Sequence, residues 1–227
     1  MTKQYRSFCT RQDLIRSAAE VIDQWGFAES SLNTISSRAG VSTGGLSFHF
    51  KNKQALGEAL ELAAAQALLS LTGAVPFRHP APLQSVIDAS QALVRSLTDD
   101  PVLRAGFGLS RDATWQGGVR LWEQWQDWVQ LSLTVARDRG TLAADVALDE
   151  VVSAITVFVA GFEVLRGTGE EWRSRDAVTG FWRLMLPQIS AEALLDELVP
   201  EGTAAGLRAA DRCRIGDSRP TKVCGGA

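Results

Sequence analysis

The sequence predicts an all-α protein. Apolar residues recur at offsets of three and four along most of the 227 residues, which is the periodicity of amphipathic helices. Runs of alternating β-branched residues bounded by hairpin turns, which would indicate strands, do not occur in it. Hydrophobic residues make up 45% of the chain, enough to form a substantial core.

The first helix is expected to begin near Thr10, because Thr10 and Asp13 have the spacing of an N-terminal capping box. Five apolar side chains at offsets near three and four would form its buried face: Leu14, Ile15, Ala18, Ile22 and Trp25. Gly26 can end this helix, since glycine adopts the left-handed conformation without a steric penalty.

Two short helices are expected next, separated by a tight turn. Ser31 is a candidate N-cap for the first of them, and Gly40 follows it where a residue without a Cβ suits the turn. The second would run from about residue 43 to residue 50. Such a pair is typical of a helix-turn-helix, whose second helix enters the DNA major groove. Asn52 would then cap a long helix over residues 53–71.

The remainder is predicted to be a larger helical region. Residues 73–82 have the character of a linker, Pro82 suits the first turn of the following helix, and Asp99-Asp100-Pro101 begins another. Further helices are expected near residues 118–139, 149–166 and 174–197. The apolar stretch 151–165 falls short of the roughly 18 residues that a membrane span needs and contains Glu163, so we interpret it as a buried helix and expect no membrane partner.

These elements divide the chain into three parts. Residues 1–54 are expected to form a three-helix helix-turn-helix domain, and residues 55–199 a larger helical domain. Residues 200–227 contain few large apolar side chains and many Gly, Arg and Asp, so this tail is expected to be mobile.

The charge distribution agrees with nucleic-acid binding by the first part alone. The whole chain has a net charge of −3, but its first 53 residues carry seven Lys or Arg and four acids, a balance of +3. The rest is therefore at −6. A small basic module on an acidic body favours DNA binding by that module, although the asymmetry alone is weak evidence.

The cysteines and histidines do not form a metal site. Cys9, Cys213 and Cys224 lie near the two ends without close spacing, and only His49 and His79 could complete a ligand set. We expect neither a metal nor another cofactor. The odd number of cysteines and the lack of a signal peptide favour the cytoplasm.

One segment resembles a known family. The stretch Ser42-Thr-Gly-Gly-Leu-Ser-Phe-His-Phe-Lys-Asn-Lys53, together with Gly26-Phe27 and residues 35–41, resembles the DNA-binding domain of TetR-family repressors. Leu46 and Phe50 would anchor its third helix in the core. The residues implied to face DNA are Arg11, Ser31, Ser42, Thr43, Gly44, Ser47, Phe48, His49 and Lys53.

The resemblance assigns roles within this set. His49 and Lys53 match family positions that clamp the DNA backbone, and Lys53 stands at the positive end of a helix dipole. Many relatives have a lysine where Thr43 stands and a tyrosine where Ser47 stands, so this helix offers fewer phosphate contacts. Alternatively, His49 is an ordinary helix-end residue and Arg11 an ordinary solvated charge.

The larger domain looks like the γ-butyrolactone-receptor branch of this family. The resemblance rests on residues 100–110, on Trp125, and on residues 136–142. A tryptophan at the position of Trp125 lines the effector pocket in that branch. The residues that we expect to line the pocket are Phe107, Leu109, Trp122, Trp125, Phe158, Phe162 and Trp182. The alternative is that these aromatic residues belong to the core or to a dimer interface.

The resemblance implies a repressor that binds double-stranded operator DNA as a homodimer and is released by a small apolar effector. A γ-butyrolactone-type lactone or furan would suit an indole-lined pocket, because an indole offers an apolar face and one hydrogen-bond donor. An antibiotic or biosynthetic intermediate would fit as well. Two alternatives belong to other classes: a helical enzyme or carrier, and a protein that interacts only through its helix faces.

Overall fold

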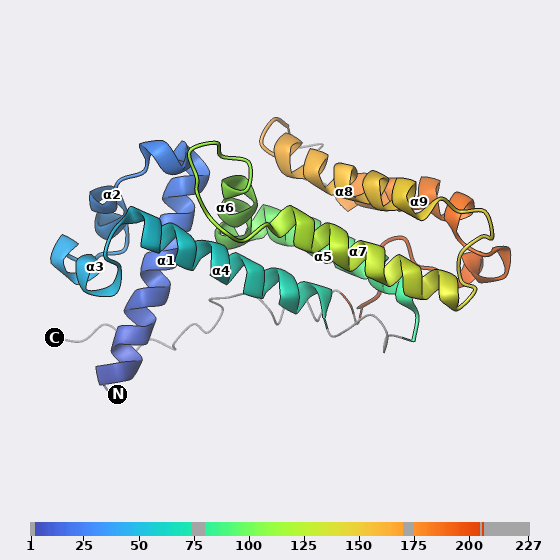
Figure 1. Cartoon of the computed structure of the whole chain (residues 1–227), viewed down its shortest axis with the longest axis horizontal. Coiled ribbons are helices and arrows are strands. Elements are labelled where there is room, and N and C mark those ends of the chain that lie inside the picture. Colours follow the sequence, from blue (N-terminus) through green and yellow to red (C-terminus); the bar gives the residue numbers. More distant parts are fainter. Residues whose placement is uncertain (1–2, 74–79, 170–174, 205, 207–227) are drawn as a thin grey trace.

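The computed structural model describes residues 3–73, 80–169, 175–204 and 206. Throughout this part the chain is helical, and its extended pairing is confined to an isolated bridge between Leu142 and Ser190. The α-helices are α1 Lys3–Glu29, α2 Leu32–Arg38, α3 Thr43–His49, α4 Lys53–Thr72, α5 Pro82–Asp99, α6 Pro101–Leu109, α7 Leu121–Asp138, α8 Leu148–Leu165 and α9 Arg175–Ile189 (Figure 1). A 3₁₀ helix, η3, covers Glu192–Glu197.

The predicted start of the first helix is wrong. Thr10 lies inside α1, which already extends from Lys3, because no Pro or Gly interrupts residues 3–10. The predicted end is confirmed in its main feature, since Gly26 has φ 77° and bends the chain before Glu29. The four aliphatic residues expected on the buried face are all buried.

Trp25 was expected in the core and instead has 59% of its surface exposed. The bend at Gly26 explains this difference. It redirects the chain so that Phe27, which is 8% exposed, fills the core at this end of α1. The ring of Phe27 packs edge-on against Trp115, with 4.7 Å between centroids.

The helices form a small head and an elongated body. Helices α1, α2 and α3 make the head at one end of the molecule, and α4 runs from the head into the body (Figure 1). Helix α6 packs against both α1 and α4, while α5 lies against α7, α8 and α9. A continuous apolar core passes from the head into the body through α1, α4 and α6.

Helices α5 and α6 are joined by a single residue, Asp100. Its backbone N–H donates to the carbonyl of Ser96 in α5 (2.7 Å), and its carboxylate accepts from the N–H of Val102 in α6 (2.9 Å). The guanidinium of Arg104 adds a 2.7 Å bond back to the carbonyl of Thr98. The two helices therefore meet at a joint without spare chain.

The C-terminal part differs from the sequence-based expectation in where its last helix ends. The helix expected over 174–197 is split: α9 runs through Pro187 and ends at Ile189, where the backbone pairs with residues 141–143, and η3 follows. The beginning of the tail is held on α5: Thr203 donates to Asp88 through its N–H (2.7 Å) and its hydroxyl (2.6 Å). Mobility of the tail over residues 200–227 stays a prediction, and residues 205 and 207–227 lie outside the described part.

Helix α8 is packed in the body, as expected for residues 151–165. Ile155 and Val159 are fully buried. Among the helices that the structure describes, none has the length and apolar character to cross a lipid bilayer.

Candidate functional site

Hydroxyl side chains begin both helices of the helix-turn-helix. Ser31 accepts a hydrogen bond from the N–H of Thr34 (3.1 Å) and Ser42 accepts one from the N–H of Gly45 (3.1 Å). Each oxygen satisfies a backbone donor that the first turn of a helix leaves open. Both serines therefore act as N-caps, and they fix where α2 and α3 start.

The third helix is held by two buried anchors, as the spacing predicts. Leu46 is 0% exposed and Phe50 is 4% exposed. The opposite face of α3 points to solvent and contains Thr43, Gly44, Ser47 and Phe48. This exposed strip, which we call the reading face, is the part of α3 that can approach a DNA groove.

The reading face combines small groups with one large apolar one. A side chain at Gly44 would meet no atom within 4 Å, so the backbone is open to close approach. The hydroxyl of Ser47 donates to the carbonyl of Thr43 (3.0 Å) and retains its lone pairs for an incoming donor. Phe48 is 82% exposed, which is unusual for a phenyl ring and suits contact with thymine methyl groups.

Arg11 and His49 both pack against aromatic rings at the end of the third helix. The guanidinium of Arg11 lies 5.0 Å from the centre of the Phe50 ring, a cation–π distance, and the residue remains exposed. The imidazole of His49 is half-buried and packs edge-on against Phe48 (5.2 Å between centroids). Both side chains have packing partners within the head, which holds them near the reading face.

Lys53 has a different environment from the one that the resemblance implies. Its ammonium donates to the carbonyls of Phe27 (2.7 Å), Ala28 (2.9 Å) and Ser30 (2.8 Å). It also lies 4.7 Å from the centre of the Phe27 ring. An ammonium group has three donors, and all three are used here. Lys53 therefore binds the C-terminal end of α1 to the start of α4.

In the body, five of the seven predicted pocket residues fall into two aromatic groups. In the first, Phe107 of α6 packs on Trp122 of α7 (4.5 Å), and Trp125 stacks on Trp128 (5.6 Å). In the second, Phe181 of α9 lies between Phe158 of α8 (4.2 Å) and Trp182 of α9 (5.3 Å). Phe107, Trp125, Phe162 and Trp182 are buried, and Trp122 and Phe158 are partly buried.

Several buried donors in the body lack an acceptor in the described part of the chain. They are the indole N–H groups of Trp125, Trp128 and Trp182 and the hydroxyl of Thr156. A buried donor without an acceptor costs about 1–3 kcal/mol. An apolar molecule with a carbonyl or ether oxygen could supply such an acceptor.

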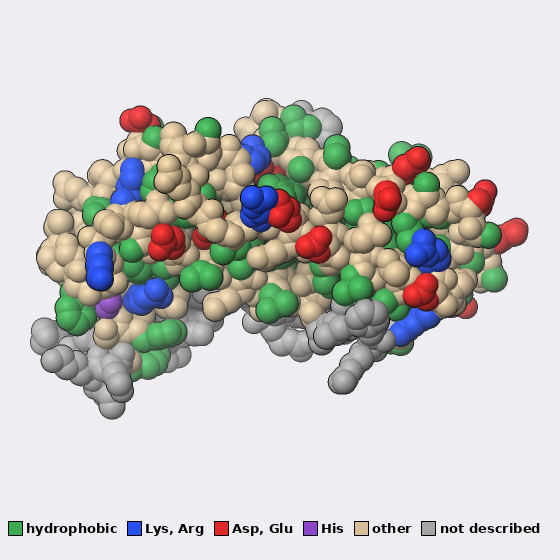
Figure 2. Space-filling model, in the orientation of Figure 1, with side chains coloured by type: hydrophobic (Ala, Val, Ile, Leu, Met, Phe, Trp, Pro, Cys, Tyr) green, Lys and Arg blue, Asp and Glu red, His purple; other side chains and the backbone are tan. Residues whose placement is uncertain are grey.

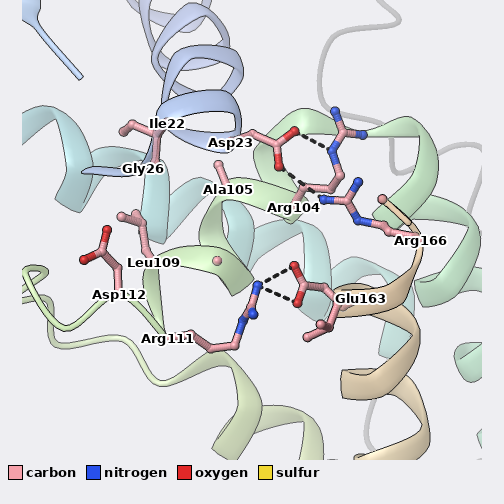
Figure 3. A pocket seen from close by; sticks show the side chains of 13 residues that line it. Ile22, Asp23, Gly26, Arg104, Ala105, Leu109, Arg111, Asp112, Glu163 and Arg166 are labelled. Carbon is pink, nitrogen blue, oxygen red and sulfur yellow. Dashed lines mark hydrogen bonds and ion pairs between the residues drawn. The ribbon is translucent and has the colours of Figure 1, made fainter. Parts of the chain in front are cut away.

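A cleft in the described part of the chain lies apart from these aromatic groups. It has a volume of about 290 Å³ and lies where α1, α6 and α8 meet (Figure 3). Of the seven residues predicted to line the pocket, Leu109 lines this cleft. Figure 2 shows Lys or Arg and Asp or Glu side chains gathered near the middle of the molecule, at this junction between head and body.

Ion pairs surround this cleft. Asp23 of α1 is bonded to Arg104 of α6 (2.8 Å) and to Arg166 at the end of α8 (3.2 Å), and Arg111 is paired with Glu163 of α8 (2.7 Å). Burial raises the pKa of the Glu163 carboxyl above its ordinary value, and the charge of Arg111 opposes this change. Burial likewise lowers the pKa of the Arg166 guanidinium, against the charge of Asp23. None of these residues was predicted from the sequence, because their partners are far away in the chain.

Comparison with known proteins agrees with this architecture. Residues 14–60 match the family model for bacterial regulatory proteins of the tetR family. The A-factor receptor protein of Streptomyces griseus is 30% identical over 207 residues, which cover 89% of this chain and 71% of that protein. The chain belongs to the TetR family. This membership confirms the predicted class, a ligand-responsive transcriptional repressor, and excludes the helical enzyme or carrier.

Solved structures of TetR-type proteins share the whole fold. A crystal structure of a γ-butyrolactone receptor, an ArpA-like protein, has a TM-score of 0.71 at 22% identity and covers 92% of this chain and 98% of that one. CprB from Streptomyces coelicolor, determined in complex with its operator sequence, has a TM-score of 0.72 at 21% identity, with the same coverage. At this identity the two structures support the fold.

Proposed function

We propose that this TetR-family protein is a cytoplasmic repressor that binds operator DNA as a homodimer and is released by a γ-butyrolactone-type effector. In this proposal residues 1–54 bind DNA and residues 55–199 bind the effector and form the dimer. The observation that carries the effector class is the set of buried indole donors around Trp125, Trp128 and Trp182. A lactone combines an apolar body with the oxygen acceptors that these donors need.

The DNA part of the proposal rests on the reading face. Thr43 can donate to phosphate oxygens or base edges, Ser47 can accept from a donor on a base edge, and Phe48 can contact a thymine methyl. Arg11 and His49 lie beside this face and can contact the backbone. Lys53 contributes its charge to the head, but its donors are occupied by the carbonyls of α1.

The dimer part rests on two exposed apolar stripes. On α8, Val157 (69% exposed) and Val164 (52%) lie two turns apart on one face, and Gly161 lies between them, one turn after Val157. On α9, Leu184 is 77% exposed and follows Gly180 by one turn. A Cβ at either glycine would meet no atom within 4 Å, so another helix can approach closely there. Helices α8 and α9 touch through Phe158 and Phe181. Exposed apolar surface on two neighbouring helices suits a dimer in which both helices pack against the same helices of a second copy.

Release requires that the effector favour one conformation. The effector must bind more tightly to a conformation whose two reading faces are wrongly spaced for DNA than to the DNA-binding conformation. A tenfold preference per site corresponds to about 1.4 kcal/mol of binding free energy. Two reading faces spaced by about one helical turn of DNA, roughly 34–36 Å, fit successive major grooves. A change in this spacing weakens binding at both half-sites together.

The test uses DNA selected from a random pool by the purified protein. Fluorescence anisotropy then measures binding of the selected duplex while a γ-butyrolactone with an alkyl side chain is added. We expect the lactone to release the DNA and to bind less tightly to a Trp125→Phe variant, which keeps an aromatic ring but lacks the indole donor. Trp25→Phe, which changes an exposed tryptophan, is the matched control and should respond like the parent protein.

Two outcomes would overturn parts of the proposal. Failure to select any duplex would contradict operator binding. Persistence of the complex at a saturating lactone concentration would contradict the effector class and direct the search to antibiotic-like ligands. Light scattering of a Val157→Asp, Leu184→Asp variant tests the dimer: we expect half the mass of the parent protein, and an unchanged mass would show that another face is used.

A further inference from the structure

A loop between α6 and α7 contacts both the head and the body. It comprises residues 110–120, which we call the junction loop. Figure 1 shows this loop, in green, against the end of α1 and the beginning of α4. Its backbone also meets α4 directly, since the amide of Gln54 donates to the carbonyl of Gln116 (3.2 Å).

Two consecutive residues of the junction loop point to different parts of the molecule. Arg111 pairs with Glu163 of α8, a helix of the proposed dimer face. Asp112 accepts a hydrogen bond from the backbone N–H of Phe27 in the head (3.1 Å), where the chain turns after Gly26. Figure 3 shows these two side chains projecting from the loop in different directions. A displacement of α8 therefore reaches the head through two adjacent residues.

Trp115 fixes this loop to α4. Its indole N–H donates to a carboxylate oxygen of Glu61 (2.8 Å), which is 2% exposed, and the other oxygen accepts from the N–H of Val119 (3.3 Å). The ring lies over Gly57, where an added Cβ would come within 2.5 Å of it. At Gly117 an added Cβ would lie 2.0 Å from the indole nitrogen. This close packing leaves one position for the ring.

The contact of Trp115 with Phe27 continues to the reading face. One part of the Phe27 ring packs edge-on against Trp115, and the ammonium of Lys53 lies 4.7 Å from the centre of the same ring. Lys53 opens α4 and follows α3 after only three residues. A shift of Trp115 is thus passed to the segment that holds α3.

A parallel set of ion pairs supports the same path. Asp23 of α1 is bonded by Arg104 of α6 and by Arg166 at the end of α8. These side chains are partly buried around the cleft, where an ion pair is less weakened by solvent than on an open surface. The head is consequently tied to α6 and α8 on both sides of the cleft.

We propose that the junction loop couples the position of α8 to the orientation of the reading face, and that Trp115 is its positioning residue. This inference rests on the proposed function, because it describes how a state of the effector domain reaches DNA. The loop acts as a rigid strut: Arg111 follows α8, Asp112 and Trp115 hold Phe27, and Phe27 holds the beginning of α4. Loosening the strut frees the head to rotate relative to the body.

The distance between head and body within one chain tests this inference. Spin labels are placed at two exposed positions, Ser37 in α2 and Gln126 in α7, after Cys9, Cys213 and Cys224 are replaced by serine. Labelled protein is mixed with an excess of unlabelled protein, and pulsed electron–electron double resonance gives the intrachain distance distribution without DNA or effector. We expect Trp115→Phe to broaden this distribution about twofold and to weaken operator binding about tenfold.

Trp25→Phe is the matched control, since it removes the same indole group from an exposed position next to the bend. It should leave the distribution unchanged. A distribution in Trp115→Phe as narrow as in the parent protein overturns the inference, and so does equal broadening in the control. Asp112→Asn replaces Trp115→Phe should that variant not fold, with the same expected broadening. Failure of the parent protein to bind an operator would count against the proposed function alone, because the distances are measured without DNA.

Discussion

Replacing Lys53 by methionine removes the ammonium and keeps most of the aliphatic stem. The structure gives that ammonium three charge-assisted hydrogen bonds, to the carbonyls of Phe27, Ala28 and Ser30. Each such bond contributes about 1.5–3 kcal/mol in a buried setting. Lys53 is partly exposed, and water can hydrate the three carbonyls in the variant, so the loss is well below the sum.

We expect Lys53→Met to lower the free energy of unfolding by about 2 kcal/mol. For a chain of this size that corresponds to a decrease of about 4–8 °C in the melting temperature. Urea unfolding followed by circular dichroism measures the change in the free energy of unfolding. Lys51→Met is the control, because Lys51 is exposed and a surface change of this kind shifts stability by only about 0.5 kcal/mol or less.

If Lys53 instead contacted a DNA phosphate, its replacement would give a different pair of results. A phosphate clamp would leave the melting temperature unchanged and would contribute about 0.9 to the log–log slope of operator affinity against salt. Observation of that smaller slope in Lys53→Met, together with unchanged stability, would refute the structural role. An unchanged slope with reduced stability would support it.

Three further predictions concern the reading face and the junction loop. Phe48→Ala should weaken operator binding about tenfold without altering the melting temperature, because its ring is 82% exposed; anisotropy titration and thermal melting check this. Gly57→Ala should destabilise the fold by about 1–3 kcal/mol, since its Cβ would collide with Trp115, whereas Gly118→Ala has open space and serves as the control in urea unfolding. The pKa of Asp112 lies below its ordinary value of 3.8, above all because the Thr114 hydroxyl donates a hydrogen bond to the carboxylate. The ionised Asp112 side chain therefore stabilises the fold above pH 3.8, and this stabilisation is lost as the pH falls through the lowered pKa. Asp112→Asn should therefore be less stable than the parent at pH 7, and this difference should shrink in strongly acidic urea titrations.

The features that the sequence predicts well are local ones. Ser31 and Asn52 each cap the helix that follows, and Pro82 opens α5, as their positions indicate. Ser42, which the resemblance implied only as a DNA-facing residue, caps α3 as well. A cap depends on a side chain and a backbone N–H only two or three residues away. The limits of α2, α3 and α4 could thus be predicted to within a residue or two.

The features that sequence analysis missed depend on distant contacts. The exposure of Trp25 follows from the way Phe27 turns inward to meet Trp115, far along the chain. The role of Lys53 follows from carbonyls more than twenty residues before it. Trp115, in a polar loop that contains Gly117 and Gly118, gave no periodic signal. A buried acid such as Glu61 in an otherwise apolar stretch of α4 was the one available hint of a partner.

The single-residue joint between α5 and α6 restricts how this lineage can change in length. An extra residue beside Asp100 would turn α6 by about 100° about its axis. Phe107 would then leave Trp122, and Arg104 would leave Asp23, in one step. Among relatives of this protein, insertions should therefore occur in surface connections and be absent at residues 99–101. Residues 99–101 thus give a fixed point from which alignments of distant relatives can be counted.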